Sequence, residues 1–202
     1  MKLLNKIFGK DFDTEPTYIC LANASDDQQE INDYIIKKQQ ERGATWSISG
    51  DRENRGLGMY KHNHAIISEG RTVHIGLDIN VPAGTILYAP FDCEVIQSEY
   101  EEGTGNYGWM CVLKCFINDA VYYFMFGHLA KENLAPVGTK LKAGEIFAKV
   151  GEFRENGQYW YHTHLQILTQ QGYDQGWAHK ATCTVEQLAI IDKLCPSPII
   201  FI

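Results

Sequence analysis

Histidines at short spacings from one another, and from one aspartate, are the residues of this chain that could carry chemistry. In His74-Ile75-Gly76-Leu77-Asp78, the histidine and the aspartate are four positions apart. On an extended strand such residues point to one face, and the glycine between them lets a backbone or a ligand come close. Imidazole and carboxylate both bind zinc, at about 2.0–2.2 Å. The motif predicts either part of a metal site or a buried histidine followed by a turn.

Two further pairs have the spacing His-x-His. If His162 and His164 lie on a strand they share a face, so both imidazoles can reach one small ion or its bound water. His62 and His64 have the same spacing, but they lie in a polar stretch close to glycines, which favours a solvated loop. A single pair of this kind is therefore weak evidence for a site.

The histidine at position 128 follows the strongly apolar stretch Val121–Phe126, in the sequence Phe126-Gly127-His128-Leu129. An imidazole at a strand end beside a glycine is placed to project into a cleft. The alternative is a core histidine whose polar atoms are satisfied.

Short β-forming stretches must position these side chains. They are rich in β-branched and aromatic residues and are separated by turns that contain glycine: 45–48, 85–88, 111–113 and 121–126. No long helix is expected between residue 44 and about residue 184. This pattern predicts a mainly β fold, an antiparallel barrel or sandwich, with a short helix near the C-terminus. Pro82-Ala83-Gly84-Thr85 recurs as Pro136-Val137-Gly138-Thr139, which suggests two copies of one hairpin unit.

One helix is expected near the N-terminus, over residues 25–43. Ser25 is a suitable N-cap, Gln28 stands at the capping-box position, and Gly43 is a natural stop. We expect residues 1–70 to form a helix-containing segment packed on the cleft, and residues 71–202 to form the β domain with a C-terminal extension.

The composition excludes several classes of partner. The chain has 202 residues and a net charge of −7, whereas nucleic-acid binding needs a basic footprint and anionic membranes attract basic segments. No apolar run approaches the ~18 residues of a membrane span. Lys6 and Lys10 interrupt the N-terminal apolar residues, so we expect no signal peptide and a cytoplasmic protein, with export by a route that reads no N-terminal signal as the alternative. The six cysteines show no disulfide spacing and are expected to be reduced thiols.

Taken in order, the motifs His-x-Gly-x-Asp, Gly-His-Leu and His-x-His resemble those of the lysostaphin-type zinc endopeptidases, which have a duplicated hybrid-motif barrel and cut peptidoglycan peptides. The resemblance covers roughly residues 71–168. It implies one zinc per chain, bound by His74, Asp78 and His164, with His128 and His162 as catalytic histidines beside the metal. Three protein ligands leave a fourth tetrahedral position open, as a catalytic zinc site requires.

Some residues depart from the secreted members of this family. The sequence Glu155-Asn156-Gly157-Gln158-Tyr159-Trp160-Tyr161 precedes the last histidine pair, and Gln166 follows it. These residues and the tail 194–200 are more similar to the peptidase-like domain of certain bacterial aminotransferase fusion proteins, whose fold does not establish a substrate.

The leading hypothesis is a zinc metalloendopeptidase that hydrolyses a peptide or peptidoglycan fragment. A zinc-binding domain that recognises such a fragment without cutting it is the alternative, and the presence of both catalytic histidines counts against it. A two-histidine phosphocarrier is a third hypothesis, but it would not need Asp78. The protein partner is unknown. If the N-terminal segment covers the cleft, Asn63, His62 or His64 could occupy the open metal position.

Overall fold

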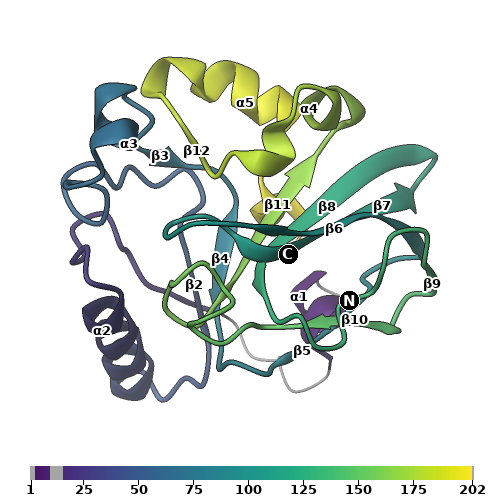
Figure 1. Cartoon of the computed structure of the whole chain (residues 1–202), viewed down its shortest axis with the longest axis horizontal. Helices are drawn as coiled ribbons and strands as arrows, with labels where there is room; N and C mark the ends of the chain where they lie inside the picture. Colours follow the sequence, from purple (N-terminus) through teal and green to yellow (C-terminus); the bar gives the residue numbers. More distant parts are fainter. Residues whose placement is uncertain (1–2, 10–15, 202) are drawn as a thin grey trace.

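A twisted sheet forms the centre of the computed structural model, which describes residues 3–9 and 16–201 (Figure 1). Within these residues the sheet has eight strands in the order β1-β2-β4-β11-β8-β7-β6-β9, and the only parallel pair among them is β1 with β2. The strands are Thr17–Tyr18 (β1), Ser47–Ser49 (β2), Leu77–Asn80 (β4), Cys93–Glu101 (β6), Gly108–Ile117 (β7), Ala120–Leu129 (β8), Lys140–Leu141 (β9) and Thr163–Leu168 (β11). The predicted mainly β, antiparallel fold is confirmed.

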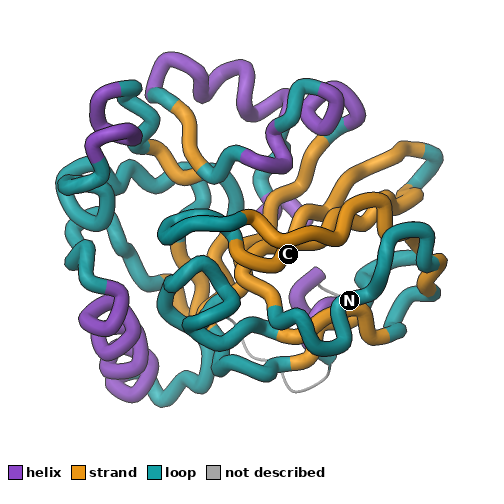
Figure 2. Tube along the Cα trace, in the orientation of Figure 1, coloured by secondary structure: helices purple, strands orange, loops and turns teal. Residues whose placement is uncertain are grey.

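Two small antiparallel sheets and several short helices surround this sheet. The strand pairs are Val73–His74 (β3) with Thr182–Cys183 (β12), and Ile86–Tyr88 (β5) with Ile146–Lys149 (β10). The helices are Leu3–Phe8 (α1), Gln28–Glu41 (α2), His64–Ser68 (α3), Gln170–Asp174 (α4) and Leu188–Leu194 (α5), with 3₁₀ helices Trp177–His179 (η2), Val185–Gln187 (η3) and Pro198–Phe201 (η4). Figure 2, in the orientation of Figure 1, shows the strands through the middle and right-hand side of the view, with α2 and α3 at the left and α4 and α5 along the top.

The sheet is buried on both faces because its central strands alternate between two apolar clusters. On β8, Phe124 and Phe126 belong to one cluster, whereas Tyr123 and Met125 belong to the other. The first cluster includes residues of α1, β5 and β10, and the second includes Leu194 of α5. Successive side chains of a strand point to opposite faces, so apolar residues at every position produce a sheet covered on both sides. Side chains on either face of the central strands therefore lie inside the protein.

The helix predicted over residues 25–43 is shorter at its start. It begins at Gln28, and Asp27 is the N-cap, because its carboxylate accepts hydrogen bonds from the backbone N–H groups of Gln29 and Glu30 at 2.9 Å each. The predicted cap Ser25 accepts instead from the N–H of Asp27. The helix ends at Glu41, and Gly43 follows with a positive φ of 63°.

The repeated four-residue motif forms the same turn twice. In each copy the threonine N–H and hydroxyl donate to the proline carbonyl, at 3.2 and 2.7 Å for Thr85 and at 3.2 and 2.6 Å for Thr139. The strands β5 and β9 follow directly. The repeat is therefore two copies of one local structure.

The segment before residue 71 joins the sheet. Strand β2 pairs with β4, and Ile48 and Ile79 are partners in the register. The predicted boundary at residue 70, between an N-terminal segment and a β domain, stays a prediction. Residues 1–2, 10–15 and 202 lie outside the described residues. No helix in the described part of the chain is long and apolar enough to cross a membrane. Each of the six cysteines is a free thiol, and five of them are buried.

Candidate metal centre

Two neighbouring strands bring Asp78 and His164 together. These residues are direct partners in the antiparallel pairing of β4 with β11. Their neighbours Leu77, Ile79 and Leu165 belong to the apolar cluster on the opposite face, so alternation turns the aspartate and the histidine to the same side. His74 comes from β3, which is paired with β12 rather than with the main sheet.

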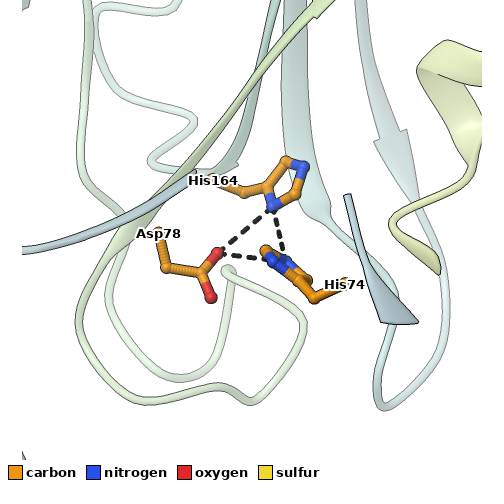
Figure 3. A group of neighbouring side chains, drawn as sticks. All are labelled: His74, Asp78 and His164. Atoms are coloured by element: carbon orange, nitrogen blue, oxygen red, sulfur yellow. Dashed lines mark hydrogen bonds and ion pairs between the residues drawn. The ribbon is translucent and has the colours of Figure 1, made fainter. Parts of the chain in front are cut away.

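Three ligand atoms from these residues form a small triangle (Figure 3). His74 Nε2 lies 3.1 Å from His164 Nδ1 and 3.4 Å from Asp78 Oδ1, and the last two atoms are 3.2 Å apart. A tetrahedral ion with bonds of about 2.0–2.2 Å separates its ligand atoms by roughly 3.3–3.6 Å. The donor types and their separations therefore fit one zinc ion, and the three side chains, each at most 3% exposed, form a buried candidate metal site.

The second nitrogen of His164 is held by Gln166. Its Nε2 lies 3.3 Å from Gln166 Oε1, and the Gln166 amide donates to the carbonyl of Trp177 at 2.9 Å. The amide is thereby oriented with its oxygen toward the ring. His164 consequently carries its proton on Nε2 and leaves Nδ1 free for a metal, as is usual where a neighbouring group fixes the tautomer of a ligand histidine. The sequence showed Gln166 only as a departure from the family pattern.

The second carboxylate oxygen of Asp78 accepts a hydrogen bond from an arginine. Arg55 Nη2 donates to Asp78 Oδ2 at 2.7 Å, and Arg55 Nε donates to Glu53 Oε2 at 2.9 Å. Burial alone would raise the pKa of Asp78, but His74 and Arg55 hold that pKa well below its usual range. Asp78 is therefore an ionised carboxylate, which is the form that binds a metal.

His128 reaches the site because the regular alternation of β8 is interrupted at its end. The residue has a positive φ of 61°, and the pairing of β7 with β8 shifts between Trp109 and Cys111. As a result Leu129 returns to the same apolar cluster as Phe126, three positions earlier. Bulges of this kind redirect a side chain, and strained backbone is frequent at functional sites. His128 consequently lines a cleft and the small cavity at the ligand triangle.

His128 and His162 are neighbours, and each ring donates to a backbone carbonyl. Their ring centroids are 4.3 Å apart. His128 Nδ1 donates to the carbonyl of Asn156 at 2.7 Å, and His162 Nδ1 donates to the carbonyl of Trp160 at 2.9 Å. Both Nε2 atoms are consequently left without a proton, and that of His162 lies 3.6 Å from Asp78 Oδ1.

Burial keeps these two imidazoles neutral. It lowers the pKa of His162 to about 4 and that of His128 well below its usual value. The indole of Trp160 stacks on His162 with centroids 4.0 Å apart, and its Nε1 donates to Asn80 Oδ1 at 2.7 Å. The stacking fixes the plane of the His162 ring, so its unprotonated Nε2 is held in one orientation beside the ligand triangle.

The site is almost closed. A cavity of about 20 Å³ is bounded by the five candidate side chains and by Met59 and Tyr60, which belong to the segment before residue 71. A larger cleft of about 290 Å³ adjoins it and is lined by Tyr60, Tyr107 and His128. The Tyr107 hydroxyl has no hydrogen-bond partner among the described residues, and burial raises its pKa well above the usual value.

The loop pair does not reach the metal position. His62 Nδ1 is bonded to Asp26, and its side chain is 74% exposed. Asn63 caps α3 by accepting from the N–H of Ile66, and His64 is the exposed first residue of that helix. The hypothesis that one of these residues fills the open position is wrong. Met59 and Tyr60, slightly earlier in the chain, are among the residues that line the small cavity.

A substitution at Gly50 tests the packing around His74 and Arg55 by stability rather than by activity. A Cβ at Gly50 would lie 2.6 Å from His74 Nδ1 and 2.7 Å from Arg55 Nη2, and its φ is +103°. Gly84 also has positive φ, +79°, but no atom lies within 4 Å of its Cβ position. Backbone strain should cost Gly84→Ala about 1–2 kcal/mol, and overpacking should cost Gly50→Ala about 1–3 kcal/mol more. Urea unfolding of both variants measures the difference, and equal midpoints would contradict the packing around His74.

The comparisons with known proteins agree with this geometry. Residues 72–175 match Peptidase family M23, which is just over half of the chain, and the chain belongs to this family. No curated protein matches the chain significantly. Nothing in these comparisons supports the finer resemblance to the domain of aminotransferase fusion proteins.

Several solved structures are similar to part of the chain. The solution structure of lysostaphin has 25% identity and a TM-score of 0.39, over 47% of this chain and 36% of lysostaphin. The catalytic domain of the antimicrobial peptidase lysostaphin from Staphylococcus simulans has 21% identity and a TM-score of 0.43, over 60% of this chain and 80% of that domain. LytU has 27% identity and a TM-score of 0.41, over 60% of this chain and 74% of LytU. The chain thus spans about a third of the length of full lysostaphin.

Proposed function

We propose that this protein is a zinc-dependent endopeptidase that hydrolyses a peptide bond in peptidoglycan peptides. The observation that carries the proposal is the triangle of three donor atoms from His74, Asp78 and His164, with the free Nε2 of His162 beside it. Membership of Peptidase family M23 supports a peptide substrate, and the antimicrobial peptidase lysostaphin is among the similar structures.

In this proposal His74, Asp78 and His164 hold the zinc ion, which supplies a Lewis acid that acidifies water and polarises a peptide carbonyl. His128 and His162 act on protons. Both are neutral with Nε2 unprotonated, so either can accept a proton from the attacking water and return it to the leaving amine. Their backbone carbonyl partners stabilise the imidazolium that forms, because each Nδ1–H already points to an oxygen.

The substrate would enter by the cleft of about 290 Å³, since His128 lines both this cleft and the small cavity beside the metal position. Tyr60 lines both spaces as well. The small cavity has room for about one water-sized molecule. A peptide carbonyl is larger than this space, so it reaches the ligand triangle only if residues that line the small cavity move.

Zinc content tests the proposal before any substrate is known. We expect about one zinc per chain after reconstitution and dialysis. A chelator should remove it without global unfolding, because a domain of this size buries enough apolar surface to fold alone. Elemental analysis and circular dichroism on the same samples check both expectations. Fewer than about 0.2 zinc per chain would exclude the metal site.

Turnover then decides between the two hypotheses that need zinc. The zinc-loaded protein is incubated with purified peptidoglycan and muropeptides, and new termini are identified by mass spectrometry. Metal-dependent products support the endopeptidase. Saturable binding of a muropeptide with no product would instead support the domain that recognises wall fragments without cutting them.

A further inference from the structure

Arg55 is a large, charged side chain that is only 1% exposed. Burying an arginine is costly unless its donors are paired. Here the guanidinium bridges two carboxylates, Glu53 and Asp78, at 2.9 and 2.7 Å. The third nitrogen, Nη1, lies 3.7 Å from the sulfur of Met59, which itself borders the small cavity.

The two oxygens of Asp78 are used differently. Oδ1 lies within 3.6 Å of a ring nitrogen of each of three histidines, His74, His162 and His164. Oδ2 is occupied by Arg55 Nη2. A carboxylate with one oxygen held in this way offers a single donor atom to an ion. Together with the two histidine nitrogens that makes three donors, and a tetrahedral ion keeps one position open for water or substrate.

The guanidinium is itself held in place by the N-terminal segment. Glu53 Oε1 accepts a hydrogen bond from the backbone N–H of Leu21 at 2.8 Å, and its other oxygen accepts from Arg55. Leu21 is fully buried in a separate apolar cluster with Ile31 and Ile35 of α2. A chain of hydrogen bonds therefore runs to the ligand triangle from a packed region of the N-terminal segment, through Leu21, Glu53, Arg55 and Asp78. The first three of these residues lie outside the family match, because that match begins at residue 72.

We propose that Arg55 is a positioning residue that restricts Asp78 to one-oxygen binding and so preserves the open position of the metal. The inference rests on the proposed zinc site. It assigns to residues 53–55 a part in the centre that neither the His-x-Gly-x-Asp motif nor the family match contains.

Cobalt provides the readout, because four-coordinate Co²⁺ absorbs visible light several-fold more strongly than five-coordinate Co²⁺. The full chain is loaded with Co²⁺, and its absorption per bound ion and its affinity by chelator competition are measured for Arg55→Met and Arg55→Lys. Arg52→Met is the matched control, since Arg52 lies three residues earlier and binds Asp51, Asp192 and the Cys195 carbonyl instead.

We expect a strong four-coordinate spectrum in the wild-type protein and in Arg52→Met. In Arg55→Met the absorption per cobalt should fall several-fold, because the freed Oδ2 joins the metal. The affinity of the protein for Co²⁺ should fall by about 10–100-fold, as is typical when a partner of a ligand is removed. Arg55→Lys should lie between them, because one ammonium group cannot bridge two carboxylates in the way that a planar guanidinium does.

If Arg55→Met does not fold, Glu53→Gln combined with Arg55→Met removes both charges together and carries the same expectation. An Arg55→Met or double-variant protein with the wild-type spectrum and affinity would overturn the role of Arg55. Absence of cobalt and zinc binding in the wild-type protein would overturn the proposed zinc site instead, so the two failures are distinguishable.

Discussion

Replacing His128 with alanine is expected to lower peptide turnover by ~10²–10⁴-fold while about one zinc stays bound per chain. This is the typical contribution of a positioned acid–base group, equivalent to about 2.7–5.5 kcal/mol of barrier. The metal should stay because the ring donates its Nδ1–H to the Asn156 carbonyl and is not part of the ligand triangle. His162→Ala should behave in the same way. The double variant should be little worse than the poorer single variant, since both groups act on one transition state.

Zinc content, melting temperature and turnover on the same preparations separate this role from a structural one. A purely structural His128 would lower the melting temperature, and activity would then fall only in proportion to the folded fraction. His179 lines the same cleft but is paired with Glu101 at 2.6 Å, so His179→Ala is the control histidine. A His128→Ala protein with full specific activity would remove His128 from the proposed mechanism.

Removing a metal ligand should lower zinc affinity, which the His128 and His162 substitutions should leave unchanged. His164→Ala and Asp78→Asn should each lose more than ~100-fold in zinc affinity, which exceeds the typical cost of removing a partner of a ligand. Turnover should fall with zinc content. Asparagine is preferable to alanine at position 78, because its side-chain oxygen can still accept from Arg55 and the guanidinium is not left buried without a partner.

The loop pair supplies the matched controls for this experiment. His62→Ala and His64→Ala remove the same type of side chain from the exposed segment, and both should retain zinc as the wild-type protein does. Isothermal titration of zinc into the apo proteins gives the affinities. Weaker zinc binding in His62→Ala, with wild-type affinity in His164→Ala, would show that the wrong histidine pair has been proposed.

Only part of the centre could be predicted from strand spacing, because His74 and Asp78 do not share the extended strand that their spacing predicts: β3 ends at His74 and β4 begins at Leu77. His164 lies on β11 opposite Asp78, and His162 is the residue directly before that strand. The position of His128 does not follow from alternation, which would put its side chain on the face of Phe124 and Phe126, opposite the site. Only the positive φ and the shifted register turn it toward the site, and neither has a clear signal in one sequence.

The surrounding residues could not be predicted at all. Arg55 contacts Asp78 across 23 residues of chain that include turns, α3 and β3. Trp160 is one of several aromatic residues before the last histidine pair. In the structure it stacks on His162, and its indole donates a hydrogen bond to Asn80, 80 residues earlier. Residues of this kind act through tertiary contacts, so they become visible only in the folded chain.

The distances along the chain between the candidate ligands have a consequence for folding. His74 and Asp78 are 90 and 86 residues from His164, and β4 and β11 must pair before the three donors meet. Closing such long loops is slow, and the unfolded chain has no local stretch with the full donor set. Zinc should consequently bind the native state alone and add stability by mass action, about 2.7 kcal/mol at a free concentration 100 times its Kd. The melting temperature should therefore rise with free zinc, which makes the metal a reporter of completed folding.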